Sequence, residues 1–131
     1  PSFLEHVVLV AGWDYSHAVE WGWPQIKYGM NYYFNADNGI PNVSDFLSGG
    51  AHQNEAEIKA AVSSGASFFN YTAHGSNTSF ADPSFTIPDV NALENAGKYP
   101  LVLANCCITG TFSVVSGALI NTIQHRLNTK V

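Results

Sequence analysis

The 131 residues predict an α/β fold with a mainly parallel sheet. Short apolar runs that are typical of buried strands alternate along the chain with segments of helical periodicity. No internal repeat, low-complexity tract or linker interrupts this alternation, and 46% of the residues are hydrophobic, which is enough for one sizeable core. We therefore expect a single domain over residues 1–131.

The first third of the chain predicts a strand, a loop and a helix. The run "HVVLVAG", residues 6–12, is rich in valine and ends in glycine, as a buried parallel strand does. The loop "WDYSHAVEWGWPQ" follows, and residues 26–39 then have apolar and aromatic side chains at helical spacing up to an Asn-Gly pair. The next stretch, "SDFLSGGAHQ" over residues 44–53, predicts a flexible connection because of its two neighbouring glycines.

The clearest helix is expected over residues 54–65. Asn54 can cap its first turn, which also carries acidic residues, and Gly65 can end it. Asp89 can cap a second, short helix in the same way. The remaining expected elements are a strand over 67–75, the short helix over 89–97, a second buried strand over 100–107 and a helix over 114–130.

Charge excludes some classes of function. Charged residues make up 11% of the chain, against about 25% in an average protein, and the net charge is -5. No basic patch is available to neutralise phosphates, so we expect no nucleic acid partner. No apolar run reaches about 18 residues, so neither a membrane span nor a signal peptide is expected. Low charge suits both an exported protein and a chain covered by a partner, and the first residue, Pro1, indicates a processed or trimmed chain.

Three chemically active side chains follow the ends of predicted strands: Asp14, His74 and Cys107. Ligand sites of parallel sheets lie outside the carboxyl ends of the strands. One predicted helix separates the strands before His74 and Cys107, so a right-handed crossover would set their ends side by side or one strand apart. A histidine within reach can take the proton of a thiol and make it nucleophilic. The alternative is a structural histidine and a core cysteine.

The two cysteines, Cys106 and Cys107, are adjacent and cannot link distant parts of a fold. Packing, reactivity or metal binding remain as their roles. A metal site on both cysteines and His74 is a weak alternative, because the CxxC spacing of tetrahedral chelators is missing. The other histidines have no suggestive partner spacing and are expected to be ordinary surface or loop residues: His6, His17, His52 and His125.

Two blocks, "FFNYTAHGSNTSFADPS" and "KYPLVLANCCITGTF", resemble the gingipains, and most closely their lysine-specific branch. Weaker similarity in "VVLVAGWDYS" and "IKYGMNYYFN" extends the resemblance to roughly residues 7–112, after which the chain departs from the family pattern. Gingipains are secreted cysteine peptidases with a caspase-like fold. The resemblance therefore implies a three-layer sandwich that is part of a catalytic domain, cleavage of proteins after lysine, and a secreted or bacterial cell-surface location.

The resemblance also implies roles for single residues. Cys107 would be the nucleophile and His74 the general base and acid. Asp14 would orient the imidazole and favour its charged form, with Glu20 as the competing acid. The backbone amides of Gly75 and Cys107 would form the oxyanion hole.

The same resemblance outlines a pocket for the residue before the cleaved bond. Thr72 and Asn105 fall where lysine-specific relatives line this pocket, and Cys106 would form part of its wall. Trp21 or Trp23 would cover the aliphatic stem of a lysine, with a buried loop anchor as the alternative. Arginine-specific relatives carry an acid in the segment that reads "WPQI" here, so an arginine pocket is not expected.

The chemistry implied by the resemblance requires no cofactor. Loop oxygens such as those of Asp82 are candidates for a structural calcium site, and a solvated carboxylate is the alternative. The implied partners are protein or peptide substrates, together with the rest of the catalytic domain or a second chain of the same precursor. The alternative function is a catalytically incomplete homologue that serves in adhesion or assembly.

Overall fold

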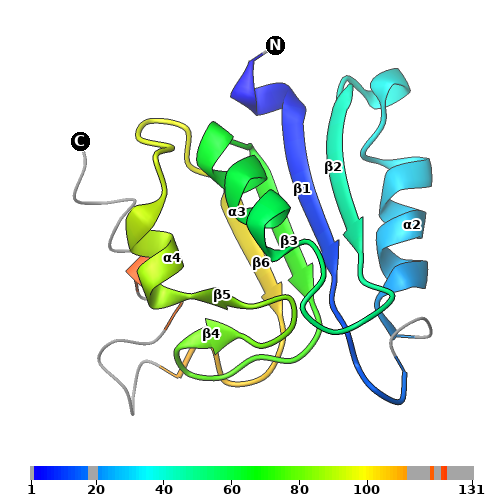
Figure 1. The fold of residues 1–131 in the computed structure, drawn as a ribbon. Helices are drawn as coiled ribbons and strands as arrows, with labels where there is room; N and C mark the ends of the chain where they lie inside the picture. The colour runs from blue at the N-terminus through cyan, green and yellow to red at the C-terminus, as the bar shows by residue number, and fades with distance from the viewer. Residues whose placement is uncertain (1, 18–20, 112–118, 120–121, 124–131) are drawn as a thin grey trace.

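The computed structural model describes residues 2–17, 21–111, 119 and 122–123. Its centre is a four-stranded sheet with the strand order β2-β1-β3-β6, in which every pair is parallel. The strands are β1 (His6–Ala11), β2 (Asn42–Leu47), β3 (Phe68–Thr72) and β6 (Leu101–Asn105). Figure 1 shows that all four arrowheads point to the same end of the molecule. The predicted α/β fold with a mainly parallel sheet is confirmed.

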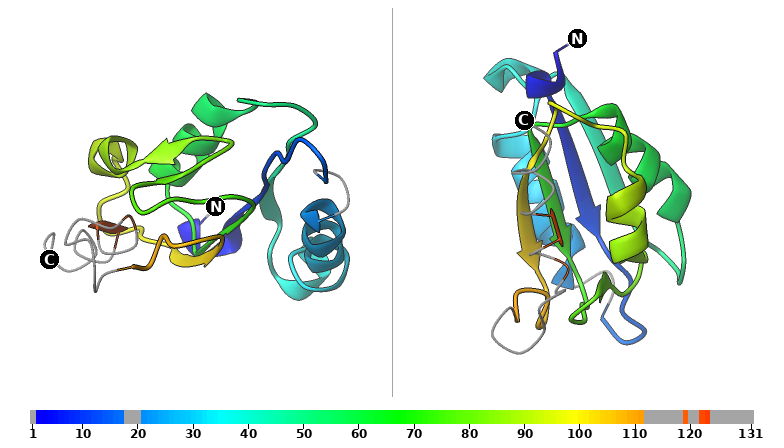
Figure 2. Two further views of the ribbon diagram at one scale, coloured as in Figure 1. Left: turned by 90° about the horizontal axis from the view of Figure 1, so that it is seen from below. Right: turned by 90° about the vertical axis from the view of Figure 1, so that its left-hand side faces the viewer.

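Helices cover both faces of this sheet, so the described residues form three layers (Figures 1 and 2). Helix α2 (Trp23–Tyr32) lies on one face, and α3 (Glu55–Ser64) and α4 (Ile87–Ala92) lie on the other. Two short strands, β4 (Ser79–Phe80) and β5 (Phe85–Thr86), form an antiparallel pair before α4.

The alternating side chains of β1 divide the apolar residues into two cores. Val7 and Leu9 pack with Ile26 of α2 in the smaller core. Val8 and Val10 belong to the larger core, which also holds buried side chains of β3, α3 and α4. Because β1 is buried on both faces, its sequence is a continuous apolar run, as predicted for residues 6–12.

Strand β2 corrects the sequence-based prediction for residues 44–53. Residues 44–47, expected in a flexible connection, belong to this strand and pair with residues 8–11 of β1. Val43 and Leu47 pack against the smaller core and Phe46 packs against the larger one, while the other three positions of the strand are polar. The strand lies at the edge of the sheet and is only half-buried, so it lacks the apolar run that marks β1.

The helices occur where predicted, with different bounds. Helix α2 begins at Trp23 rather than at residue 26, because a proline suits the first helical turn, and it ends at Tyr32. The predicted C-terminal part of this helix instead forms the short 3-10 helix η2 (Ala36–Asn38), closed by Gly39 at φ 79°. A second 3-10 helix, η1 (Phe3–Glu5), precedes β1.

The capping predictions need two corrections. Asn54 precedes α3 but has φ 61° and makes no capping hydrogen bond with its side chain. Helix α4 is capped by Thr86 and not by Asp89, whose carboxylate accepts the Thr86 N–H from inside the first turn. The helix expected over 114–130 lies mostly outside the described residues.

Among the described residues, no helix is long and apolar enough to cross a membrane.

Candidate active site

Three neighbouring strands bring the predicted catalytic residues to one edge of the sheet. The pairing register sets Ala11, Thr72 and Asn105, the last residues of β1, β3 and β6, at the same level. Asp14 and Cys107 follow within three and two residues, and His74 follows within two. The expectation that the strands before His74 and Cys107 end side by side is confirmed.

His74 and Asp14 form a hydrogen-bonded pair through Nε2 of the imidazole and Oδ2 of the carboxylate. The other oxygen of Asp14 accepts the backbone N–H groups of Ser16 at 2.8 Å and of His17 at 2.7 Å. The His74 hydrogen bond first, and then these amides, hold the pKa of Asp14 at about 2. An ionised carboxylate can only accept, so Nε2 of His74 carries the proton and Nδ1 remains as the basic nitrogen.

Gly75 allows the loop after β3 to pack tightly on the turn after β6. A Cβ atom at Gly75 would lie 2.8 Å from Cγ2 of Thr109 and 2.9 Å from both Sγ of Cys106 and the carbonyl oxygen of Cys107. No side chain fits this space without displacing its neighbours. The glycine therefore holds the segment that carries His74 against the segment that carries the cysteines.

The two cysteines have different surroundings. Cys106 is half-buried, packs against the larger core, and lies with its sulfur 3.5 Å from the Thr109 hydroxyl. Burial raises the pKa of the Cys106 thiol and keeps it protonated. Cys107 is exposed, and Ile108 directly after it has φ 46°, a left-handed conformation that β-branched residues rarely adopt. Of the two thiols, that of Cys107 is the more accessible.

A cavity of about 400 Å³ opens at this edge of the sheet. Its lining includes most of the predicted site residues: Asp14, Trp21, Thr72, His74, Asn105, Cys106 and Cys107. Trp23 does not belong to the lining, and its indole N–H donates to the Ser48 carbonyl at 3.3 Å while its ring packs against the smaller core. These contacts agree with the alternative of a structural anchor for Trp23, whereas Trp21 lines the cavity.

A neutral polar network underlies one side of the cavity. Oε1 of Gln25 accepts hydrogen bonds from the Thr72 hydroxyl and from Nδ2 of Asn105, both at 3.4 Å. Asn70, in turn, donates to the Thr72 hydroxyl at 3.2 Å. The sequence analysis noted the segment of Gln25 only because it lacks the acid of the arginine-specific relatives. Nothing in the local sequence indicates that Gln25 has hydrogen-bond partners on β3 and β6.

His17 is a site residue that the sequence prediction missed. It lines the cavity, its ring stacks on Trp21 with centroids 3.9 Å apart, and its Nδ1 lies 3.4 Å from Oδ1 of Asp14. The available signal was its spacing, three residues after Asp14 and four before Trp21, which fits one turn of chain. His6 also differs from the expectation, since its ring bonds to Gly65 and Ser44 across the sheet.

The remaining predicted residues belong to the oxyanion hole, to the competing acid and to the alternative metal site. Among the hydrogen bonds of the described residues, none is donated by the amides of Gly75 or Cys107, and the oxyanion hole stays a prediction. Glu20 and His125 lie outside the described residues. Within the described residues, Cys106, Cys107 and His74 do not form a group of metal ligands with all atoms within 4.8 Å of one another. That alternative metal site is not formed.

The fold and the site define a class of protein: a three-layer α/β protein with cysteine, histidine and aspartate gathered at the carboxyl ends of parallel strands. The model of peptidase family C25 matches residues 1–124, and the chain belongs to this family. The match extends past residue 112, so the expectation that the resemblance ends there is wrong. The predicted membership of the gingipain family is confirmed.

Named relatives and solved structures agree with this assignment. Lys-gingipain W83 of Porphyromonas gingivalis is 41% identical over 131 residues, covering 95% of this chain and 7% of the relative. A second Lys-gingipain of that species is 40% identical over 114 residues, covering 85% of this chain and 6% of the relative. The chain thus spans less than a tenth of these curated relatives.

Two solved structures share the fold. One, described as the structure of a protease, has a TM-score of 0.85 and 42% identity, covering 92% of this chain and 26% of that chain. The Arg specific cysteine proteinase gingipain R has a TM-score of 0.73 and 21% identity, covering 92% of this chain and 28% of that chain. The described fold therefore corresponds to about a quarter of a gingipain structure.

Proposed function

We propose that this chain belongs to the catalytic domain of a cysteine endopeptidase that cleaves protein substrates after lysine. The observation that carries the proposal is the His74–Asp14 pair, which shares one cavity with the exposed Cys107. The proposal includes a secreted or cell-surface location, as for the gingipains. Because the chain spans 26% of the most similar structure described above, further chain would complete the substrate pocket.

The chemistry would proceed through an acyl-enzyme. Nδ1 of His74 takes the proton of the Cys107 thiol, and the thiolate attacks the carbonyl carbon of the scissile bond. The amides of Gly75 and Cys107 donate to the oxygen that becomes negatively charged. The imidazolium, stabilised by Asp14, then gives its proton to the leaving amine as the C–N bond breaks. In the second half-reaction His74 deprotonates a water that attacks the thioester and releases the carboxylic acid and the thiol.

The preference for lysine rests on the neutral polar wall of the cavity. An ammonium group needs a few oxygen acceptors, and the Thr72 hydroxyl and the amide oxygen of Asn105 are of this kind. A guanidinium group is bound best by a carboxylate in bidentate geometry. The one carboxylate in the described lining, Asp14, is engaged by His74 and two backbone amides. Trp21, 60% exposed, can cover the aliphatic stem of the substrate.

The test is covalent labelling by a lysyl chloromethyl ketone and its arginyl counterpart, read by intact mass and peptide mapping. It is run on the 131-residue chain and on a longer chain that contains it. We expect a single adduct on Cys107, formed faster with the lysyl probe, that Cys107→Ala removes and the matched control Cys106→Ala retains. Equal labelling of both cysteines, or no labelling of either chain while both remain folded, would contradict the proposal and favour the adhesion or assembly role.

A further inference from the structure

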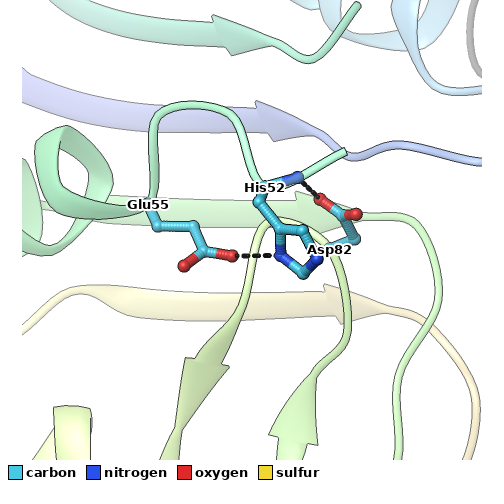
Figure 3. Close-up of side chains that lie close together, drawn as sticks. All are labelled: His52, Glu55 and Asp82. Atoms are coloured by element: carbon cyan, nitrogen blue, oxygen red, sulfur yellow. Dashed lines mark hydrogen bonds and ion pairs between the residues drawn. The ribbon is translucent and has the colours of Figure 1, made fainter. Parts of the chain in front are cut away.

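A second cluster of polar side chains lies outside the cavity. His52 comes from the connection between β2 and α3, Glu55 is the first residue of α3, and Asp82 follows β4. Figure 3 shows these three side chains converging from separate parts of the chain. One ligand atom from each lies within 4.8 Å of the others. We propose that His52, Glu55 and Asp82 bind one divalent transition-metal ion of the zinc type.

The donor set favours such an ion. One imidazole nitrogen with two carboxylate oxygens is common at zinc sites, whereas Ca²⁺ and Mg²⁺ take oxygen ligands. Nδ1 of His52 and Oε1 of Glu55 are 3.0 Å apart. Two ligands at about 2.0–2.1 Å from a tetrahedral ion are separated by roughly 3.3 Å, so this pair is already at ligand spacing. The Asp82 carboxylate offers the third ligand atom, and water can complete the shell because His52 is exposed.

Each carboxylate is oriented by a hydrogen bond from the backbone amide of another residue. Oε1 of Glu55 accepts the Ser84 N–H at 3.0 Å, and Oδ1 of Asp82 accepts the His52 N–H at 2.8 Å. Among the described residues, no hydrogen bond reaches Oε2 of Glu55 or Oδ2 of Asp82. Hydrogen bonds of this kind orient ligating carboxylates in metal sites, and the fixed Oε1 of Glu55 keeps a lone pair for the ion.

The charge of the cluster also favours the binding of a cation. Two carboxylates face one imidazole, and within the described residues neither carboxylate has a lysine or arginine in salt-bridge contact. Lys59, the lysine on the same helix, pairs with Asp89 at 3.0 Å. A divalent ion would neutralise the two carboxylates.

An ion at this place would support the candidate active site without taking part in its chemistry. The carbonyl oxygen of Asp82 accepts the Trp13 N–H at 2.9 Å, one residue before Asp14. A Cβ atom at Gly12 would lie 2.3 Å from the same oxygen, so the two segments are in tight contact. Fixing Asp82 to the start of α3 would therefore restrain the loop that carries Asp14.

The experiment is calorimetric titration of the chelator-stripped protein with Zn²⁺. A Cys106→Ser/Cys107→Ser background keeps thiolates from binding the ion. We expect one equivalent to bind. His52→Asn, which suits the left-handed φ of 57°, and Glu55→Gln should each weaken binding at least tenfold, while Glu57→Gln, an exposed acid of the same helix turn, should not change it.

Two further measurements separate this site from its rivals. With Co²⁺ as a probe, the protein with intact cysteines should show d–d absorption without a thiolate charge-transfer band, and a tenfold excess of Ca²⁺ should not displace Zn²⁺. Before the titration, the unfolding temperature of each metal-free variant is compared with that of the metal-free parent. A variant that unfolds at a different temperature is replaced by Asp82→Asn. Absence of saturable binding, full binding by His52→Asn and Glu55→Gln, or displacement by Ca²⁺ would overturn the proposal.

Discussion

At the scale of single residues, the missing side chain of Gly75 sets the distance between the two loops of the candidate site. Its Cβ position is crowded by Thr109, Cys106 and the backbone of Cys107, all within 2.9 Å. Gly110, four residues after Cys106, offers a matched comparison because a Cβ atom there meets nothing within 4 Å. The two glycines thus differ in crowding but lie in the same part of the fold.

Gly75→Ala should lower the free energy of unfolding by about 1–3 kcal/mol, the usual cost of overpacking, and should slow alkylation of Cys107 by iodoacetamide. Gly110→Ala should change neither quantity. Urea denaturation and timed alkylation with mass detection measure both effects. Equal behaviour of the two variants would show that the loops separate without cost, contrary to the close contact described.

The residue-level predictions from sequence succeeded where a general rule of topology applied. Asp14, His74 and Cys107 could be placed at one edge because each follows a strand of a parallel sheet. His17 and Gln25 could not be placed in this way. The contacts of His17 depend on the path of a loop, and those of Gln25 depend on which helix face meets β3 and β6.

At the scale of elements, the first turn of α4 is held by a charged residue. Asp89 accepts hydrogen bonds from the backbone and hydroxyl of Thr86 at 2.8 and 2.7 Å and pairs with Lys59 of α3 at 3.0 Å. Partial burial raises the pKa of Asp89, but the hydrogen bonds from Thr86 and Lys59 together outweigh it and hold that pKa below its ordinary value of 3.8. The two helices on this face of the sheet are therefore linked by an ion pair.

This linkage predicts a dependence of stability on pH. A depressed pKa in the folded state means that the stabilisation is present above the unfolded pKa of about 4 and is lost as pH falls through the lower, folded value. The wild type should therefore be more stable than Asp89→Asn at pH 7, with the difference shrinking below pH 4. Urea denaturation from pH 7 to pH 2.5 measures it, and Asp37→Asn, at an exposed position, should show no such convergence. A constant difference across this range would rule out the ion pair as its source.

The elements that could be predicted from sequence are those with an apolar pattern, including β6, which was expected to be a buried strand but is an exposed edge strand of the sheet. Strand β1 and helix α3 have continuous or periodic apolar patterns and were found, whereas β2 was taken for a connection. Asn42–Leu47 carries an aspartate and two other polar residues because this edge strand is only half-buried, and Val43, Phe46 and Leu47 are its side chains that pack on the two cores. The start of helix α2 was predicted at residue 26 instead of Trp23, because a tryptophan followed by a proline is also typical of a loop.

At the scale of the whole molecule, the larger core is connected to the candidate site through Tyr71. Its ring is 1% exposed and stacks on Phe80 with centroids 4.0 Å apart. Its hydroxyl lies within donating distance of the carbonyl oxygens of His74, at 3.0 Å, and of Asp82, at 3.1 Å, and accepts the Asp82 N–H at 3.2 Å. Burial raises the pKa of Tyr71 above its ordinary value, so the hydroxyl keeps its proton. One core side chain thus restrains both the histidine and the segment packed against the Asp14 loop.

Tyr71→Phe should separate the packing of this ring from its hydrogen bonds. The ring is retained, so the core keeps its volume. The Asp82 amide loses its acceptor, and the carbonyl of His74 or of Asp82 loses the one O–H that Tyr71 can donate. Leaving a buried polar group without a partner costs about 1–3 kcal/mol, and we expect the free energy of unfolding to fall by this amount. The rate of Cys107 labelling should fall as well, because the backbone of His74 loses one of its restraints.

The matched control is Tyr28→Phe on α2, where the side chain is 55% exposed and no described hydrogen bond involves its hydroxyl. This variant should match the parent in urea denaturation and in timed labelling. If Tyr71→Phe is as stable as Tyr28→Phe, the hydroxyl does not join core and loops. If it is destabilised while Cys107 reacts at the parent rate, the core supports the fold but not the position of His74. Only a parallel loss of stability and labelling rate would show that the buried sheet face positions His74.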